Sequence, residues 1–283
     1  MEEKLCSFEK KFIDFIRMKK YSSQTEKAYL YHLKKFTDFK YPTHQTRMSS
    51  QDIHDYLLYL NTKNVSDSYY NQAINAIRFF FKYVLNKKIK DYLVVRPKKA
   101  KTQPILLSDN ELQELLNKCN NLKHKSILSL IASSGLRVSE IVNLKIEDID
   151  SKCMIIRVRS SKGRKDRQCL LDRNVLKLLR EYYKEYKPKE YLFNGQFSSK
   201  YTTRSIEEFT RQYALKANIK KRVYPHLLRH QQITGLIENG TDIYATQYHS
   251  GHSSMKTTSG YIHLSPKYIS NIQSPLTQIT WNK

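Results

Sequence analysis

Pro225-His-Leu-Leu-Arg-His230 is the stretch that decides the fold and chemistry of the second half of this chain. Proline is favoured at the first position of a helix, so a helix is predicted to begin here. On that helix His226 and Arg229 are three residues apart and share one face. Unpaired N–H groups and the positive dipole end of a helix start favour an anion. The stretch therefore predicts an anion site at a helix start.

Three further clusters carry residues of matching chemistry. Gly135-Leu-Arg-Val-Ser-Glu140 places Arg137 at a predicted helix start, with Glu140 one turn later. The other two are Lys162-Gly-Arg-Lys-Asp-Arg167 and Gly251-His252-Ser-Ser-Met-Lys-Thr-Thr-Ser-Gly-Tyr261. Two arginines, a lysine and two histidines at one point would form a socket for a phosphodiester, because guanidinium groups bind phosphate oxygens bidentately and stay charged. They would also stabilise the charge that develops around phosphorus during displacement.

Tyr261 is the candidate nucleophile of this socket. A phenol is a weak nucleophile near neutral pH, since its ordinary pKa is about 10, and it becomes useful beside cationic groups and a base. Lys162, on a predicted hairpin tip, could protonate the leaving 5′ oxygen. The sequence has no carboxylate cluster with Mg²⁺ or Zn²⁺ spacing, so no metal and no cofactor are expected.

The overall charge predicts a polyanionic partner. Lys and Arg total 50 against 26 Asp and Glu, a formal net charge of +24, and nucleic acid is the commonest polyanion that such a protein binds. Six residues are candidate DNA contacts, although a solvated linker and a solvated hairpin tip are the alternatives: Lys98, Lys99, Lys101, Arg164, Lys165 and Arg167. No apolar stretch is long enough to span a bilayer, so no membrane contact is expected. The four cysteines are far apart without a C-x-x-C pair, which indicates reduced thiols in a cytoplasmic protein, and a DNA-binding protein is expected at the nucleoid. Cys153 and Cys169 are expected to be buried thiols.

The hydrophobic pattern predicts a mainly α protein with a small antiparallel β-sheet, in two domains. Residues 1–95 form a helical domain whose aromatic stripes are core, residues 96–106 a basic linker with two prolines, and residues 107–283 a second domain. Capping boxes at Ser23-x-x-Glu26 and Ser108-x-x-Glu111 open two helices. Others are predicted over residues 52–60, from about residue 68, and over residues 124–133 with a stop at Gly135. Residues 154–159 and 167–171 are predicted to form a hairpin, and helices follow from residue 174.

Taken together and in this order, the four clusters closely resemble the tyrosine recombinase (integrase) family, and most of all its Xer-type members. Ser134-Gly-Leu-Arg-Val-Ser-Glu140 is similar to the family's first arginine box, Lys162 to Arg167 to its catalytic hairpin, and Pro225 to His230 to its second arginine box. The interval from His252 to Tyr261 matches the nucleophile segment. The resemblance covers nearly the whole chain and implies a two-domain clamp, a helical core-binding domain followed by an integrase-type catalytic domain.

The resemblance also implies a role for each residue. Arg137 and Arg229 would clamp the scissile phosphate, His252 would donate a hydrogen bond to it, His226 would manage the tyrosine proton, and Lys162 would be the general acid. Glu140 would orient the site. Tyr261 would form a 3′-phosphotyrosyl bond, with strand exchange through a Holliday junction by a homotetramer on two paired inverted-repeat sites. An accessory protein or second recombinase could take part, and residues 265–283 would dock on a neighbouring subunit.

Two other readings stay open from the sequence. A type IB topoisomerase uses similar chemistry to relax DNA, and a basic DNA-binding protein need not cut at all. The sequence also departs from the family pattern at Gln231-Gln232, where small and aromatic residues are usual, and at Ser250, where leucine is common. These departures concern packing around the site and leave the reacting groups in place.

Overall fold

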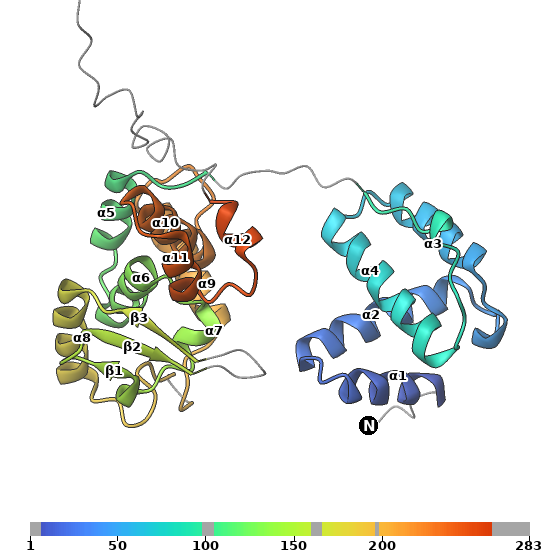
Figure 1. The fold of residues 1–283 in the computed structure, drawn as a ribbon, viewed down its shortest axis with the longest axis horizontal. Coiled ribbons are helices and arrows are strands. Elements are labelled where there is room, and N and C mark those ends of the chain that lie inside the picture. Colours follow the sequence, from blue (N-terminus) through green and yellow to red (C-terminus); the bar gives the residue numbers. More distant parts are fainter. Residues whose placement is uncertain (1–6, 98–104, 160–165, 196–197, 262–283) are drawn as a thin grey trace, which may run out of the picture. The chain divides into compact units, whose positions relative to one another are not determined.

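The computed structural model describes residues 7–97, 105–159, 166–195 and 198–261 (Figure 1). The chain divides into two compact units, Met1–Lys101 and Thr102–Lys283. Each unit has an apolar core of its own. The division falls within residues 96–106, the segment predicted to be a linker.

The first unit is helical, and its core is built from aromatic side chains. Phe12, Phe36, Phe80 and Phe81 are fully buried, and Phe12 meets Phe79 edge to face with ring centroids 5.5 Å apart. Such edge-to-face contacts add to the stabilisation from burial. The aromatic stripes of this region are therefore core, as the sequence predicted. The elements are α1 (Ser7–Met18), α2 (Ser23–Phe39), η1 (Gln45–Arg47), α3 (Ser50–Thr62), α4 (Asp67–Phe79), the π-helical continuation η2 (Phe80–Val84) and η3 (Asp91–Leu93).

The helix starts in this unit correct one detail of the sequence prediction. The cap of α2 is Ser22, whose side chain accepts a hydrogen bond from the Thr25 backbone N–H, whereas the sequence predicted Ser23. Two adjacent serines can each cap a helix, so the local pattern does not choose between them. The helix predicted from about residue 68 begins at Asp67, behind a Ser66 cap.

The second unit packs eight helices of the described residues around and beside a small sheet (Figure 1). Its buried core runs from the first helix to the last long one and includes Leu115, Ile131, Tyr182 and Phe193. The helices are α5 (Asp109–Asn117), α6 (Leu122–Ser134), α7 (Val138–Ile141), α8 (Arg173–Tyr186), α9 (Thr203–Lys216), α10 (Pro225–Glu238), α11 (Ile243–Ser250) and α12 (Met255–Ser259), with the 3₁₀ turn η4 (Ile146–Asp148).

The sheet is antiparallel and has the order β1-β2-β3, with β1 (Ile149–Asp150), β2 (Ile155–Val158) and β3 (Arg167–Leu170). In the β2–β3 pair Ile156 lies opposite Cys169, and both side chains are buried. The predicted hairpin is confirmed, but the two-residue strand β1 was not predicted. Cys153 is exposed, so the expectation that it is buried was wrong: it lies in the turn before β2, outside the alternating pattern.

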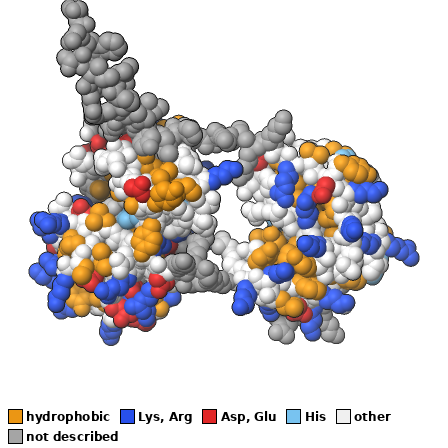
Figure 2. All heavy atoms as spheres, viewed as in Figure 1, with side chains coloured by type: hydrophobic (Ala, Val, Ile, Leu, Met, Phe, Trp, Pro, Cys, Tyr) orange, Lys and Arg blue, Asp and Glu red, His pale blue; other side chains and the backbone are white. Residues whose placement is uncertain are grey.

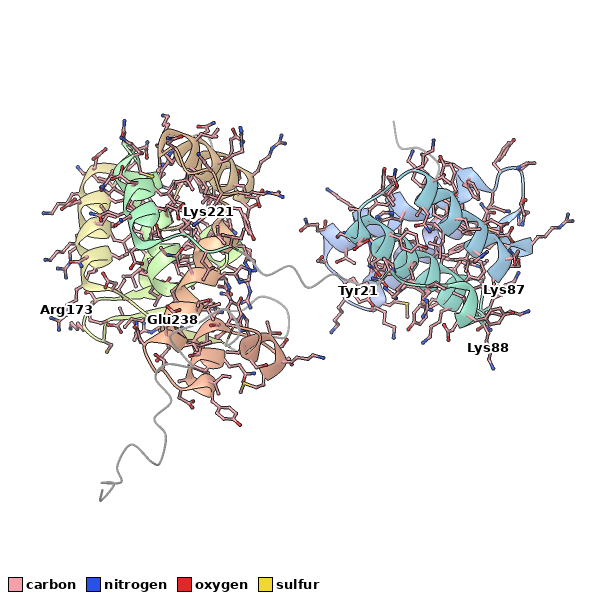
Figure 3. The ribbon with its side chains drawn as sticks, turned by 90° about the horizontal axis from the view of Figure 1, so that it is seen from above. Tyr21, Lys87, Lys88, Arg173, Lys221 and Glu238 are labelled. Atoms are coloured by element: carbon pink, nitrogen blue, oxygen red, sulfur yellow. The ribbon has the colours of Figure 1, made fainter. Side chains whose placement is uncertain are left out.

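Local start and stop signals position the elements that carry the site. Ser108 and Glu111 form the predicted capping box of α5, and α6 ends at Gly135 in the left-handed conformation, with φ 63°. Lys221, labelled in Figure 3, donates to the Leu106 carbonyl at 2.9 Å and to Glu111 at 2.6 Å. This contact fastens the beginning of the unit to the loop that leads into α10.

The surface carries the charge that the composition predicts. Lys and Arg side chains are spread over the visible face of each unit and outnumber the acidic ones there (Figure 2). In the ranges described, none of the helices is both long and apolar enough to span a bilayer. The expected fold class, mainly α with a small antiparallel sheet, is confirmed.

Candidate active site

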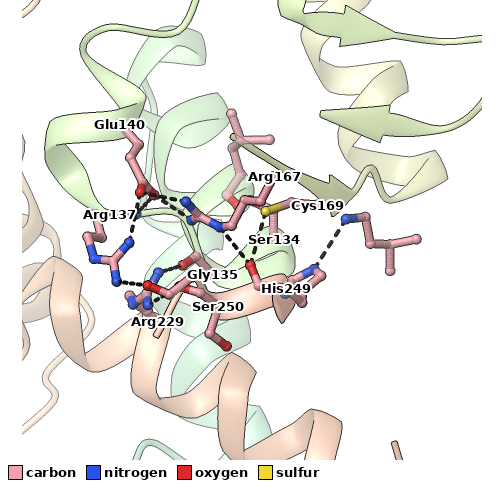
Figure 4. Close-up of polar contacts among 12 residues, drawn as sticks. Ser134, Gly135, Arg137, Glu140, Arg167, Cys169, Arg229, His249 and Ser250 are labelled. Atoms are coloured by element: carbon pink, nitrogen blue, oxygen red, sulfur yellow. Dashed lines mark hydrogen bonds and ion pairs between the residues drawn. The ribbon is translucent and has the colours of Figure 1, made fainter. Parts of the chain in front are cut away.

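Three arginines from three elements meet at the end of α11 (Figure 4). Arg167 of β3 donates to the His249 carbonyl at 2.9 Å, Arg229 of α10 to the Ser250 carbonyl at 2.6 Å, and Arg137 before α7 to the Gly251 carbonyl at 2.7 Å. The last carbonyls of a helix lack intrahelical partners and form the negative end of its dipole. Three consecutive carbonyls therefore place three cations side by side.

Glu140 joins two of these arginines from the other side. It pairs with Arg137 at 2.9 Å and accepts two bonds of 2.8 Å from Arg167. Burial alone would raise the pKa of the Glu140 carboxyl, but its hydrogen bonds and charge interactions with Arg167 and Arg137 lower it to about 2. The carboxylate is therefore ionised at neutral pH and orients both guanidinium groups.

Arg229 is the most deeply buried of the three, with 1% of the residue exposed. It also donates to the carbonyl of Gly135, the residue that ends α6. Its Nε has no hydrogen-bond partner among the described residues. Burial, and then the neighbouring Arg137, lower the pKa of Arg229 to about 10, so it is still protonated at neutral pH. A buried guanidinium with an unused donor is a ready site for an anionic oxygen.

Tyr261 lies in the same place, directly after α12. It packs against Ile233 and Ile237 of α10, and its hydroxyl is hydrogen-bonded to Nδ1 of His230 at 2.5 Å. Burial raises the pKa of the phenol, while the charges of Arg229 and Arg137 act in the opposite direction. The buried phenol thus keeps its proton at neutral pH in the absence of DNA.

Two histidines, His230 and His252, contact Tyr261, and a third, His226, contacts His230. The His252 ring is stacked on the Tyr261 ring, with centroids 5.8 Å apart, and its Nδ1 bonds to Thr258 Oγ1 at 3.0 Å. The His226 ring meets the His230 ring edge to face at 4.3 Å. Burial is the main cause that lowers the pKa of all three, to about 4 for His230 and His252. All three imidazoles are consequently neutral at neutral pH, and each can donate and accept.

The structure brings together five of the six predicted catalytic residues, namely Arg137, His226, Arg229, His252 and Tyr261, together with Glu140. The sixth, Lys162, lies outside the described residues, as do the candidate DNA contacts Lys98, Lys99, Lys101, Arg164 and Lys165.

Arg167 does not match its expected role as a DNA contact. Its side chain is only 6% exposed, and its guanidinium is occupied by Glu140 and the His249 carbonyl. The sequence placed it beside the basic hairpin tip, where a solvent-facing arginine is the ordinary expectation. Its position as the first residue of β3 instead turns it toward the core.

His230 is a site residue that the sequence reasoning missed. It lies one helical turn after His226, on the same face of α10, and the signal was its spacing within the stretch that was already quoted. His249 was missed too: its Nε2 accepts a hydrogen bond from the Leu170 backbone N–H at 3.2 Å, which holds α11 against β3. No grouping of three or more potential metal ligands occurs in the residues that the structure describes.

Comparison with known proteins gives consistent matches along the chain. The family described as "Phage integrase family" matches residues 106–267, and "Phage integrase, N-terminal SAM-like domain" matches residues 8–91. The tyrosine recombinase XerD of Staphylococcus epidermidis is 32% identical over 278 residues, which cover 91% of this chain and 94% of that protein.

Solved structures agree with these matches. The XerA recombinase is 31% identical, with a TM-score of 0.56, and the match covers 96% of this chain and 97% of that one. A XerH recombinase bound to its palindromic difH substrate is 20% identical, with a TM-score of 0.74, covering 94% of this chain and 84% of that one. The second likeness concerns the fold alone.

Proposed function

We propose, because the chain belongs to the phage integrase family, that Tyr261 is the nucleophile with which it cuts and rejoins DNA. The protein is a tyrosine recombinase, an enzyme of site-specific DNA recombination. One observation carries the assignment: the hydroxyl of Tyr261 is hydrogen-bonded to His230, and the phenol lies close enough to Arg229 and Arg137 for their charges to act on it. Of the 21 tyrosines in the chain, it is the one that follows the predicted nucleophile motif.

Arg137, Arg229 and His252 are proposed to hold the scissile phosphate. Arg229 offers its unused Nε, and Arg137, whose side chain is 22% exposed, is still reachable from solvent. Guanidinium groups fixed in advance by Glu140 and by α11 need not reorganise when negative charge builds on the phosphoryl oxygens. Their rigid placement is the main contribution that the protein makes to a phosphoryl transfer.

The proposed reaction conserves the energy of the phosphodiester. Oη of Tyr261 gives its proton to a neighbouring histidine as it attacks phosphorus, the bond to the 5′ oxygen breaks, and Lys162 supplies the proton that makes a free 5′ hydroxyl. The product is a 3′-phosphotyrosyl bond, which a 5′ hydroxyl from a partner strand can attack in turn. No ATP is required, because one phosphoester replaces another.

The assembly is proposed from the same family. A homotetramer would join two sites with inverted repeats and exchange strands through a Holliday junction, with an accessory protein or second recombinase as a possible further partner. A XerH recombinase on a palindromic substrate supports the inverted repeats, and a lambda integrase dimer on a core site supports more than one subunit on each site. Lys98, Lys99, Lys101, Arg164 and Lys165 are proposed to contact double-stranded DNA, where neutralised phosphates make binding salt-dependent. Such a protein would act on DNA in the cytoplasm, at the nucleoid.

Covalent trapping tests the nucleophile. The protein is mixed with duplexes that carry a nick next to the scissile phosphate, so that the short product diffuses away, and the mixture is run in SDS. The wild type is expected to give an SDS-resistant protein–DNA adduct, and Tyr261→Phe none. Tyr244→Phe, an exposed position on α11, is the matched control and should give the wild-type yield.

The same assay separates the two other readings. Tight binding without any adduct from wild type would support a DNA-binding protein that does not cut. Relaxation of supercoiled plasmid by the protein, without exchange between two sites, would support a topoisomerase. An adduct that persists in Tyr261→Phe would remove Tyr261 from the mechanism.

A further inference from the structure

The hydroxyl of Tyr261 makes its hydrogen bond with a histidine that belongs to none of the expected catalytic positions. Nδ1 of His230 lies 2.5 Å from Oη, short for a hydrogen bond between neutral groups. The pair is 31 residues apart in sequence, and Ile233 and Ile237, later on the same helix α10, clamp the phenol ring. Packing of the buried phenol ring against α10 thus holds its hydroxyl next to His230.

The direction of this bond follows from the protonation states. His230 is neutral at neutral pH because burial, and then the positive field of His226 and Arg229, depress the pKa of its imidazole to about 4. The phenol keeps its proton, because burial raises its pKa. The phenol therefore donates and Nδ1 accepts, which places the imidazole proton on Nε2.

The neighbouring histidines are less suited to take the phenol proton. His252 is stacked nearly parallel to the tyrosine ring, with an interplanar angle of 16°, so it presents its face to the phenol, and its Nδ1 is used by Thr258. His226 meets His230 edge to face, and no hydrogen bond joins it to Tyr261 among the contacts of the described residues. His226 therefore contacts the ring of His230, and it is His230 that contacts the phenol.

We propose that His230 is a catalytic residue, the general base that removes the proton of Tyr261 during cleavage and returns it during rejoining. In cleavage the Oη–H bond breaks, the proton moves to Nδ1, the Oη–phosphorus bond forms and the bond to the 5′ oxygen breaks. The departing 5′ oxygen takes its proton from a separate acid. In rejoining, a 5′ hydroxyl attacks phosphorus, the Oη–phosphorus bond breaks, and the imidazolium protonates Oη. The inference rests on the proposed function of Tyr261.

The arrival of DNA would make His230 a better base. The groups that face it are Arg229, which is charged, and three that are neutral at neutral pH, namely His226 on α10, and His252 and Tyr261 from the segment after α11. A phosphodiester bound between Arg137 and Arg229 brings a negative charge that offsets part of this positive field. An opposite charge nearby raises the pKa of an imidazole. Proton transfer would thus be favoured only when the substrate is in place.

The test compares His230→Asn and His230→Ala in single-turnover cleavage of the nicked duplex at saturating DNA, between pH 4 and 9, a range that includes the lowered pKa of the His230 imidazole. Asparagine can accept the phenol's hydrogen bond but cannot carry its proton, so it separates positioning from proton transfer. Both variants are expected to cleave about 100-fold more slowly or worse, the range for loss of a general base, with the affinity for DNA unchanged. Both should lose the rise in rate that wild type shows as the imidazole deprotonates. Added imidazole should restore part of the rate of His230→Ala, which a purely structural role would not permit.

A second substrate shows which proton transfer is affected. A duplex with sulfur in place of the bridging 5′ oxygen has a leaving group that needs no protonation, so it should restore cleavage by Lys162→Ala but not by His230→Asn. The proposal would be overturned if His230→Asn cleaved at a rate within threefold of wild type and with the same pH dependence. It would also be overturned if His226→Asn lost the pH dependence of cleavage while His230→Asn kept it. An adduct in Tyr261→Phe would instead refute the nucleophile assignment, so the two failures are distinguishable.

Discussion

Glu140 and Arg167 meet fork to fork, with the two guanidinium nitrogens 2.8 Å from the two carboxylate oxygens. The pair is largely buried, with side-chain exposures of 15% and 6%. A second arginine, Arg137, shares the same carboxylate. One acidic residue thus balances two cations, of which Arg167 is buried and Arg137 is 22% exposed.

Replacement of that acid should be costly for the fold. Glu140→Gln leaves Arg167 and Arg137 without their anion, and breaking a buried ion pair costs about 3–5 kcal/mol. Calorimetric unfolding should show the loss in the free energy of unfolding of the second unit. Glu208→Gln, which breaks the exposed pair with Arg211, is the control and should leave the transition where it is. If the unfolding transition of Glu140→Gln were the same as that of wild type, the ion pair between Glu140 and Arg167 would not stabilise the second unit.

Acid should weaken the second unit in two steps. The buried imidazoles of His124 and His249 have a pKa of about 4, mainly because of desolvation, against an ordinary value of 6.5. The unfolded chain therefore binds more protons below pH 6.5, and stability falls from there toward pH 4. The Glu140 carboxylate, with a pKa of about 2 against 4.5, stabilises the fold above pH 4.5 and loses this effect as the pH falls to 2.

Thermal unfolding at a series of pH values measures both steps. His124→Phe should reduce the dependence between pH 6.5 and 4, because His124 stacks on Phe209 at 4.0 Å and a phenyl ring keeps that contact without titrating. The variant also loses the hydrogen bonds of the imidazole with the hydroxyls of Tyr213 and Tyr201, so the slope against pH is compared and not the midpoint itself. Glu140→Gln should flatten the dependence below pH 4.5. A midpoint that stays constant from pH 7 to 4 in wild type would contradict the assignment of neutral buried histidines.

The glycine at the end of α11 should resist substitution. Gly251 has a φ of 62°, and a Cβ there would lie 2.9 Å from the Arg167 guanidinium. Gly251→Ala is expected to lower the free energy of unfolding by about 1–3 kcal/mol through backbone strain, and to slow DNA cleavage by displacing Arg167.

Gly235→Ala is the matched comparison for that variant. It lies inside α10, where a Cβ would meet nothing within 4 Å, and alanine is a better helix former by up to ~1 kcal/mol. It should therefore stabilise the protein. Equal unfolding temperatures for the two variants would argue against the strain at Gly251.

Arg229→Lys tests the phosphate socket. Lysine keeps the charge, but its three donors all sit on one ammonium nitrogen. It therefore cannot reproduce the planar fork with which Arg229 reaches the carbonyls of Gly135 and Ser250 through two separate nitrogens and keeps Nε for phosphate. Adduct formation on the nicked duplex should slow by about 100-fold or more, the usual effect of losing one donor to a developing oxyanion. The binding constant for DNA should change little, because the other phosphate contacts remain. Arg211→Lys, on the exposed face of α9, should cleave like wild type.

The sequence predicted those parts of the site that depend on local signals. Pro225 begins α10 and Gly135 ends α6, because proline and a left-handed glycine restrict the backbone wherever they occur. The capping box of α5 is local in the same way. These signals were sufficient to place Arg137, His226 and Arg229 at helix starts or on one helix face.

The rest depends on contacts between distant segments, which no local pattern contains. Arg167 reaches Glu140 across 27 residues, and His230 reaches Tyr261 across 31. The strand β1 has two residues, too few for any alternation to be seen. Whether a residue in a basic hairpin faces solvent or the core is decided by the sheet register, and this is why Arg167 was misplaced.

The way in which the arginines bind the end of α11 determines which substitutions are tolerated there. The three arginines bond to the main-chain oxygens of residues 249, 250 and 251, and a peptide oxygen is the same whatever side chain its residue carries. Ser250, where leucine is usual, therefore supplies Arg229 with the same acceptor. A substitution at residue 250 can therefore change how α11 packs, while the hydrogen bonds that hold the three arginines remain.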